Sequence, residues 1–174
     1  RANPAPISGR DALLINQIQF YDEPVRFTEK LNILCDELEE RVRQGVGVAP
    51  ADAPRVLVSG CPMAAPNWKL PFVVETSGAV IVGEESCVGE RGTRNLVAED
   101  GADREAMLDR IASRYLDIDC ACFTPNAERL EHVVEMARTY GADGVIHYAI
   151  QFCAPYTIEA ARVEKALDRE AIPM

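Results

Sequence analysis

Apolar residues recur along most of the chain at the spacing of amphipathic helices, interrupted by short apolar runs typical of buried strands. Helical spacing predicts helices over 10–21, from Pro24 to near Gly45, and over 68–76, 103–116, 125–140 and 156–170. Thr124 is expected to cap the fifth of these helices, with Pro125 in its first turn. Apolar runs predict strands over 55–60, 79–83 and 144–150, and residues 171–174 are expected to begin a fourth strand.

The alternation of helices and strands predicts an α/β fold, a three-layer, mostly parallel sheet with helices on both faces, Rossmann- or flavodoxin-like. Residues 1–9 are expected to form a linker, and residues 10–174 a single α/β domain. The helix that begins at Pro24 is expected to pack on the sheet, with Cys35 as an ordinary core residue.

Charge and hydropathy exclude several classes of partner. The chain has 18 Lys and Arg against 28 Asp and Glu, a formal net charge of −10, so a nucleic-acid partner is not expected. No apolar run is long enough to span a bilayer, and no charged-then-apolar leader is visible. We therefore expect a cytoplasmic protein with no membrane partner.

Five of the six cysteines are expected to meet at one edge of the sheet. Cys61 directly follows the first predicted strand, Cys87 lies four residues after the second, and Cys153 lies three residues after the third. Cys120 and Cys122 precede the helix that leads into the third strand, so they belong to the same edge. Ligands of open parallel sheets bind outside the carboxyl ends of the strands, which makes this edge the candidate site.

The chemistry of these thiols is left open by the residues alone. Convergent cysteines with few histidines suit an iron–sulfur cluster. Thiolates also bind zinc, although no C-x₂-C pair is present. A redox disulfide between Cys120 and Cys122 is strained at this spacing. The remaining reading is a set of buried cysteines at loop ends that hold no metal.

Charged residues in the loop after the second predicted strand are weaker candidates. Arg91 and Arg94 suit a carboxylate or phosphate ligand, although solvated surface charge is the commoner role. Glu84, Glu85 and Glu90 suit proton transfer, although such carboxylates are more often surface charge.

Four cysteine motifs appear in order along the chain: GCPMAAPNWKL at 60–70, SGAVIVGEESCVGER at 77–91, DCACFTPN at 119–126 and IQFCAPY at 150–156. Together they resemble the 2-hydroxyacyl-CoA dehydratase and benzoyl-CoA reductase superfamily, to which the 2-hydroxyglutaryl-CoA dehydratase D-component belongs. The similarity extends over residues 7–174.

The resemblance implies an oxygen-sensitive iron–sulfur protein of anaerobes that receives single electrons from an ATP-hydrolysing iron–sulfur activator. In the dehydratases the [4Fe-4S] cluster contacts an acyl-CoA substrate, and a ketyl radical loses water. In the related double-cubane branch, two cubanes joined by a sulfide reduce small molecules. The number of cysteines favours the double-cubane branch over a dehydratase.

The resemblance also assigns ligands. Cys153 matches the family's cluster cysteine near the C-terminus, and Cys61, Cys87 and Cys120 resemble the additional ligands of the double-cubane branch. Cys122 is in place to be a further metal ligand.

Family subunits carry an N-terminal domain with further cluster cysteines, and this sequence has no counterpart to it. We therefore expect the C-terminal, cluster-binding domain of a longer subunit, with its last strand truncated. The full-length enzyme is expected to form a dimer, and the domain alone is expected to be inactive and free of the cluster. The alternative from another functional class is a metal-free or zinc-stabilised interaction domain.

Overall fold

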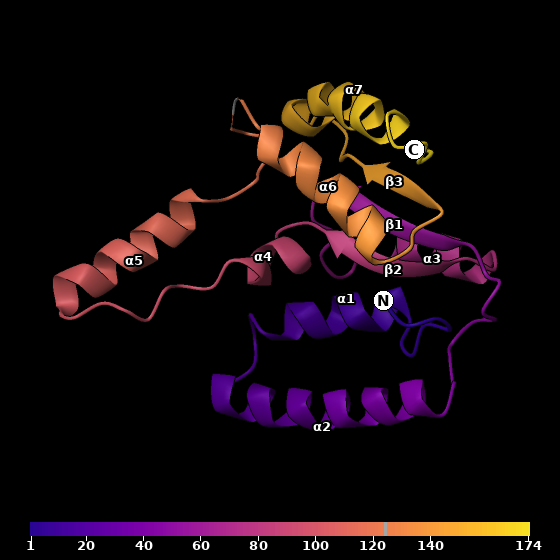
Figure 1. The fold of residues 1–174 in the computed structure, drawn as a ribbon, viewed down its shortest axis with the longest axis horizontal. Coiled ribbons are helices and arrows are strands. Elements are labelled where there is room, and N and C mark those ends of the chain that lie inside the picture. The colour runs from indigo at the N-terminus through magenta and orange to yellow at the C-terminus, as the bar shows by residue number, and fades with distance from the viewer. Residues whose placement is uncertain (124) are drawn as a thin grey trace.

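The computed structural model describes residues 1–123 and 125–174, so the expected cap Thr124 lies outside the described residues. The elements follow one another with helices before, between and after the strands (Figure 1). They are α1 (Gly9–Ile18), α2 (Pro24–Arg43), β1 (Arg55–Gly60), α3 (Lys69–Thr76), β2 (Val80–Glu85), α4 (Glu90–Arg94), α5 (Arg104–Leu116), α6 (Ala127–Thr139), β3 (Gly144–Tyr148) and α7 (Ala154–Asp168).

The strands form one parallel sheet in the order β2-β1-β3, which confirms the α/β fold. Successive side chains of the central strand β1 point to opposite faces, as the pleat requires. Leu57 packs with α6 and α7 on one face, and Val58 packs with α1 and α3 on the other. The sheet is therefore the middle layer of three.

Local sequence accounts for where the helices begin. The Ser8 hydroxyl accepts a hydrogen bond from Asp11 N at the start of α1, and the Asp103 carboxylate accepts one from Ala106 N at the start of α5. Pro24 stands in the first turn of α2, where its missing N–H costs nothing. In the described residues α6 begins at Ala127, two residues later than expected.

The ends of two strands differ from the sequence-based expectation. β2 continues to Glu85, so Cys87 lies two residues beyond its end, and β3 ends at Tyr148. Residues 171–174, expected to begin a fourth strand, have no strand assignment, although Val145 N of β3 donates to Pro173 O at 2.9 Å. Pro173 has no N–H with which to extend the ladder.

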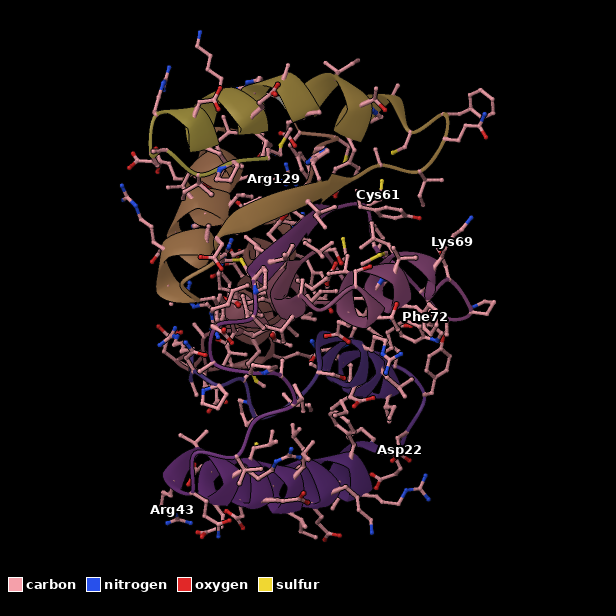
Figure 2. The ribbon with its side chains drawn as sticks, turned by 90° about the vertical axis from the view of Figure 1, so that its right-hand side faces the viewer. Asp22, Arg43, Cys61, Lys69, Phe72 and Arg129 are labelled. Carbon is pink, nitrogen blue, oxygen red and sulfur yellow. The ribbon has the colours of Figure 1, made fainter. Side chains whose placement is uncertain are left out.

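The expectation that α2 packs on the sheet is also wrong. No residue of α2 is buried, and the helix lies outside α1, the helix that covers the sheet. Figure 2 shows the same arrangement, with Asp22 just before the start of α2 and Arg43 at its end. Cys35 is exposed on α2 and is not a core residue. The apolar stripe of the sequence identifies an amphipathic helix but not the surface against which it packs.

Two other segments complete the outline. Residues 1–9 were expected to be a linker, but Gly9 begins α1 and the residues before it contact the sheet: Ala5 is buried beside Ala53 and Val80, and Arg55 Nη1 donates to Ala2 O at 3.1 Å. α5 projects from the body of the domain (Figure 1) and has no buried residue. No helix in the described residues combines the length and the apolar character needed to cross a membrane.

Candidate functional site

A glycine at the end of β1 places the first candidate thiol. Gly60 has φ +124°, and a Cβ built on it would lie 2.1 Å from Tyr148 O on the neighbouring strand. This close approach allows Cys61 N to donate to the same carbonyl oxygen at 2.8 Å. Gly60 therefore allows Cys61 to lie at the strand-end edge of the sheet (Figure 2), where Cys61 is only 2% exposed.

Cys61 forms one group of thiols with Cys153. Cys153 precedes the first turn of α7 and is partly buried. Ile150 N donates to Cys61 Sγ at 3.5 Å. Burial raises the pKa of the Cys61 thiol, and the neighbouring Cys153 raises it further, against the hydrogen bond from Ile150. Two segments separated by about ninety positions in the sequence thus bring a buried thiol and a half-buried thiol together.

Cys87, Cys120 and Cys122 form a second group on the same edge. Arg91 Nη1 lies 3.7 Å from Cys87 Sγ, and the Tyr156 hydroxyl lies 3.8 Å from Cys120 Sγ. Burial acts to raise the pKa of Cys120, but contacts with Cys122 and Tyr156 and the charge of Arg91 outweigh it, so this pKa is lowered. The contact with Cys120 raises the pKa of Cys122.

A buried network of charges lies between these thiols and the core. Arg129, which is fully buried, donates to Ser59 Oγ and to Glu85 Oε2, each at 3.0 Å. It also forms an ion pair with Glu159. Glu85 in turn accepts from Arg91 Nε at 2.8 Å. Two arginines and two glutamates therefore balance one another in the interior; Figure 2 labels Arg129 and Cys61.

This network corrects the role expected for Glu85, the last residue of β2, and for Arg91, a residue of α4. Arg91 and Glu85 are 5% and 1% exposed, so neither is a solvated surface charge. Arg94 forms an ion pair with the buried carboxylate of Asp119, next to Cys120. The positive charges of this loop are thus matched within the protein.

Sequence reasoning missed Arg129, Glu159 and Tyr156, although the helical pattern held a signal. Arg129 stands four and eight residues before the buried Val133 and Ala137 of α6. Glu159 has the same spacing from buried residues of α7. A charge at a core position of an amphipathic helix requires a buried partner, which only the fold identifies.

Glu84, the residue before the last in β2, differs from the carboxylates near it. Burial raises its pKa to about 7, and the charge of Glu85 acts in the same direction. Its two carboxylate oxygens are buried, and neither has a hydrogen-bond partner in the described residues. It lines a cavity of about 510 Å³ between α1 and β2, on the face opposite the charge network. Glu90, by contrast, accepts a hydrogen bond from the Tyr140 hydroxyl.

The thiols have hydrogen-bond donors beside them, a feature that bears on whether they fit an iron–sulfur cluster. Within residues 1–123 and 125–174, no three His, Cys, Asp or Glu side chains converge on one metal ion. A structural zinc site requires four ligands around one point. An iron–sulfur cluster instead spreads its thiolates over several metal atoms and is stabilised by hydrogen bonds to sulfur. The donors near Cys61, Cys87 and Cys120 fit that requirement.

Comparison with known proteins identifies the family. The family model of the 2-hydroxyglutaryl-CoA dehydratase D-component matches residues 1–174. The chain is 34% identical over 168 residues to YjiM of Escherichia coli, a protein provisionally described as a dehydratase subunit. It is 26% identical over 155 residues to the beta subunit of (R)-phenyllactyl-CoA dehydratase of Clostridium sporogenes. It is 27% identical over 157 residues to subunit beta of (R)-2-hydroxyglutaryl-CoA dehydratase of Acidaminococcus fermentans.

These matches cover 94%, 88% and 84% of this chain, in the order given, but 41%, 38% and 38% of the relatives. The chain thus spans about two fifths of the length of the curated relatives it matches. The resemblance carried by the four cysteine motifs is confirmed. The chain belongs to the 2-hydroxyglutaryl-CoA dehydratase D-component family.

Proposed function

We propose that this chain is the iron–sulfur cluster-binding domain of an oxygen-sensitive dehydratase that acts on 2-hydroxyacyl-CoA thioesters. Cys61, Cys87, Cys120 and Cys153 are its proposed cluster ligands, with Cys122 as a further candidate. The observation that carries the proposal is that thiols from four separate segments lie in two groups beyond the carboxyl ends of the strands. The reaction class is supported by the names of the two dehydratase beta subunits.

The residues of this chain prepare the thiols for such a group. When bound, an iron–sulfur cluster supplies one-electron chemistry at a potential set by its surroundings. Ile150 N donates to Cys61 Sγ at 3.5 Å, and Cys153 directly precedes the first turn of the 15-residue α7. The buried charge network reaches both segments: Arg91, four residues after Cys87, donates to Glu85, and the side-chain amide of Asn126 donates both to Glu159 Oε1 and to the Cys120 carbonyl oxygen, each at 3.0 Å.

The proposed enzyme needs protein partners. Relatives of this chain are named as subunits of dehydratases, and the chain spans about two fifths of their length. We therefore propose that the rest of the subunit, a partner subunit and an ATP-hydrolysing activator complete the system. The activator supplies the electron, and the remainder of the enzyme supplies substrate contacts.

A reductase with a double-cubane cluster is the second candidate. It is favoured by one observation, the five thiols that lie in two groups on the same edge. A single [4Fe-4S] cluster takes four thiolates. The iron content per chain distinguishes the two candidates, since the second requires twice as much.

Replacing one proposed ligand tests the proposal. In the intact protein, purified without oxygen, Cys153→Ser is expected to lower iron and acid-labile sulfide in parallel. Cys35→Ser is the matched control, because Cys35 is exposed on α2, away from the strand ends. Equal iron in Cys153→Ser and the wild type would contradict the ligand assignment.

A further inference from the structure

Cys87 and Cys120 lie on different segments, and one arginine and one tyrosine connect them. Cys87 follows β2, whereas Cys120 lies in the loop before α6. Building on the proposed function, we propose that Arg91 and Tyr156 form a clasp that holds these two thiols together and donates hydrogen bonds to them. Both are positioning residues, and neither is a proposed ligand.

The direction of each hydrogen bond follows from the chemistry of the groups. Arg91 Nη1 lies 2.9 Å from the Tyr156 hydroxyl oxygen and 3.7 Å from Cys87 Sγ. A guanidinium is a donor only, so the hydroxyl oxygen of Tyr156 must accept. The hydroxyl hydrogen of Tyr156 is then free to be donated to Cys120 Sγ, 3.8 Å away. Arg91 Nη1 thus donates directly to Cys87 Sγ, and it is linked to Cys120 Sγ through the Tyr156 hydroxyl.

The clasp is anchored in the sheet rather than in a mobile side chain. The Arg91 side chain is 3% exposed, and its Nε donates to Glu85 Oε1 at 2.8 Å. Glu85 belongs to β2 and is itself held by Ser59 Oγ at 2.9 Å and Arg129 Nη2 at 3.0 Å. These contacts satisfy the charge of Arg91 without Nη1, which remains directed at Tyr156 and Cys87.

Tyr156 is equally fixed. It is 5% exposed, and the guanidinium carbon of Arg129 lies 5.2 Å from the centroid of its ring. It belongs to the first turn of α7, the helix that follows Cys153. The Tyr156 hydroxyl therefore connects α7, which follows Cys153 of the first thiol group, to Cys120 of the second group.

The clasp has two expected effects on a bound cluster. It holds an exposed thiol, Cys87, near a partly buried one, Cys120, before the metal arrives. It also places donors on both sulfurs, and such donors favour the reduced, more negative state of a cluster. Loss of the Tyr156 hydroxyl should therefore lower the reduction potential and weaken capture of thiophilic metal ions.

The test is Tyr156→Phe in the intact protein, which removes a single oxygen and retains the ring. Tyr115→Phe is the matched control, because Tyr115 is 64% exposed on α5. For protein purified without oxygen, we expect the midpoint potential of the cluster to shift downward in Tyr156→Phe and to stay unchanged in Tyr115→Phe. A Tyr156→Phe protein with full iron, full sulfide and an unshifted potential would overturn the clasp.

A second measurement separates the clasp from the proposed function. In metal-free protein, Cd²⁺ is titrated and its thiolate absorption followed in the ultraviolet. Tyr156→Phe is expected to bind Cd²⁺ about tenfold more weakly than the wild type, a typical effect of losing a group that supports a ligand. Equal affinity overturns the clasp. A wild type that never contains iron or sulfide overturns the proposed function, and the Cd²⁺ affinities still decide for or against the clasp.

Discussion

Arg129→Met tests whether the buried charge network stabilises the fold as a unit. Arg129 is fully buried and is the only cationic partner that Glu159 has among the described residues. Methionine fills much of the same space but leaves the Glu159 carboxylate uncompensated, while Glu85 keeps Arg91. Removing one partner of a buried ion pair costs about 3–5 kcal/mol.

The loss can be measured as a shift of the urea midpoint. With a urea dependence of about 2 kcal/mol per molar, the midpoint should fall by roughly 1.5–2.5 M. The 174-residue chain contains a single tryptophan, Trp68, which packs on the core cluster around Leu13, so its fluorescence reports unfolding.

Two further variants make the result interpretable. Arg138→Met, on the same helix, removes an exposed ion pair with Glu170 and should cost about 1 kcal/mol or less. Adding Glu159→Gln to Arg129→Met removes the uncompensated charge and should recover part of the lost stability. Equal midpoints for Arg129→Met and Arg138→Met would refute the reasoning.

Two other predictions concern the strand ends. Gly60→Ala should lower the melting temperature more than Gly45→Ala, because both glycines have positive φ but only the methyl group at Gly60 would meet a backbone oxygen, Tyr148 O at 2.1 Å. Thermal unfolding monitored by circular dichroism measures both melting temperatures, and equal losses would contradict the close approach of the two strands at Gly60. Burial raises the pKa of Glu84 to about 7, so between about pH 5 and 7 the folded state retains a proton that the unfolded state releases, and the free energy of unfolding should fall as the pH rises. Urea titrations at several pH values should show a weaker pH dependence for Glu84→Gln, and an unchanged dependence would contradict the raised pKa of Glu84.

Much of the fold could be predicted because local patterns and chain direction determine it. The apolar run 55–60, bounded by Pro54 and a glycine, coincides with β1, and the alternation of elements requires a parallel sheet with covered faces. The same directional argument places Cys120 and Cys122 at the strand-end edge, where they meet Cys87.

What could not be predicted depends on contacts between distant residues. The partners of Arg129 lie 70, 44 and 30 positions away in the sequence, at Ser59, Glu85 and Glu159. The helical pattern places Arg129 at a core position of α6, but it does not identify these partners. The prediction that α2 packs on the sheet was wrong for a related reason, because the apolar stripe of a helix does not specify the surface against which it packs.

The central claim is that the thiols at the strand ends hold an iron–sulfur cluster. The most direct test measures iron, zinc and acid-labile sulfide in the intact protein purified without oxygen, together with its visible spectrum. We predict broad visible absorption with iron and sulfide in equal amounts. Zinc alone, or protein with neither iron nor sulfide, would contradict the account.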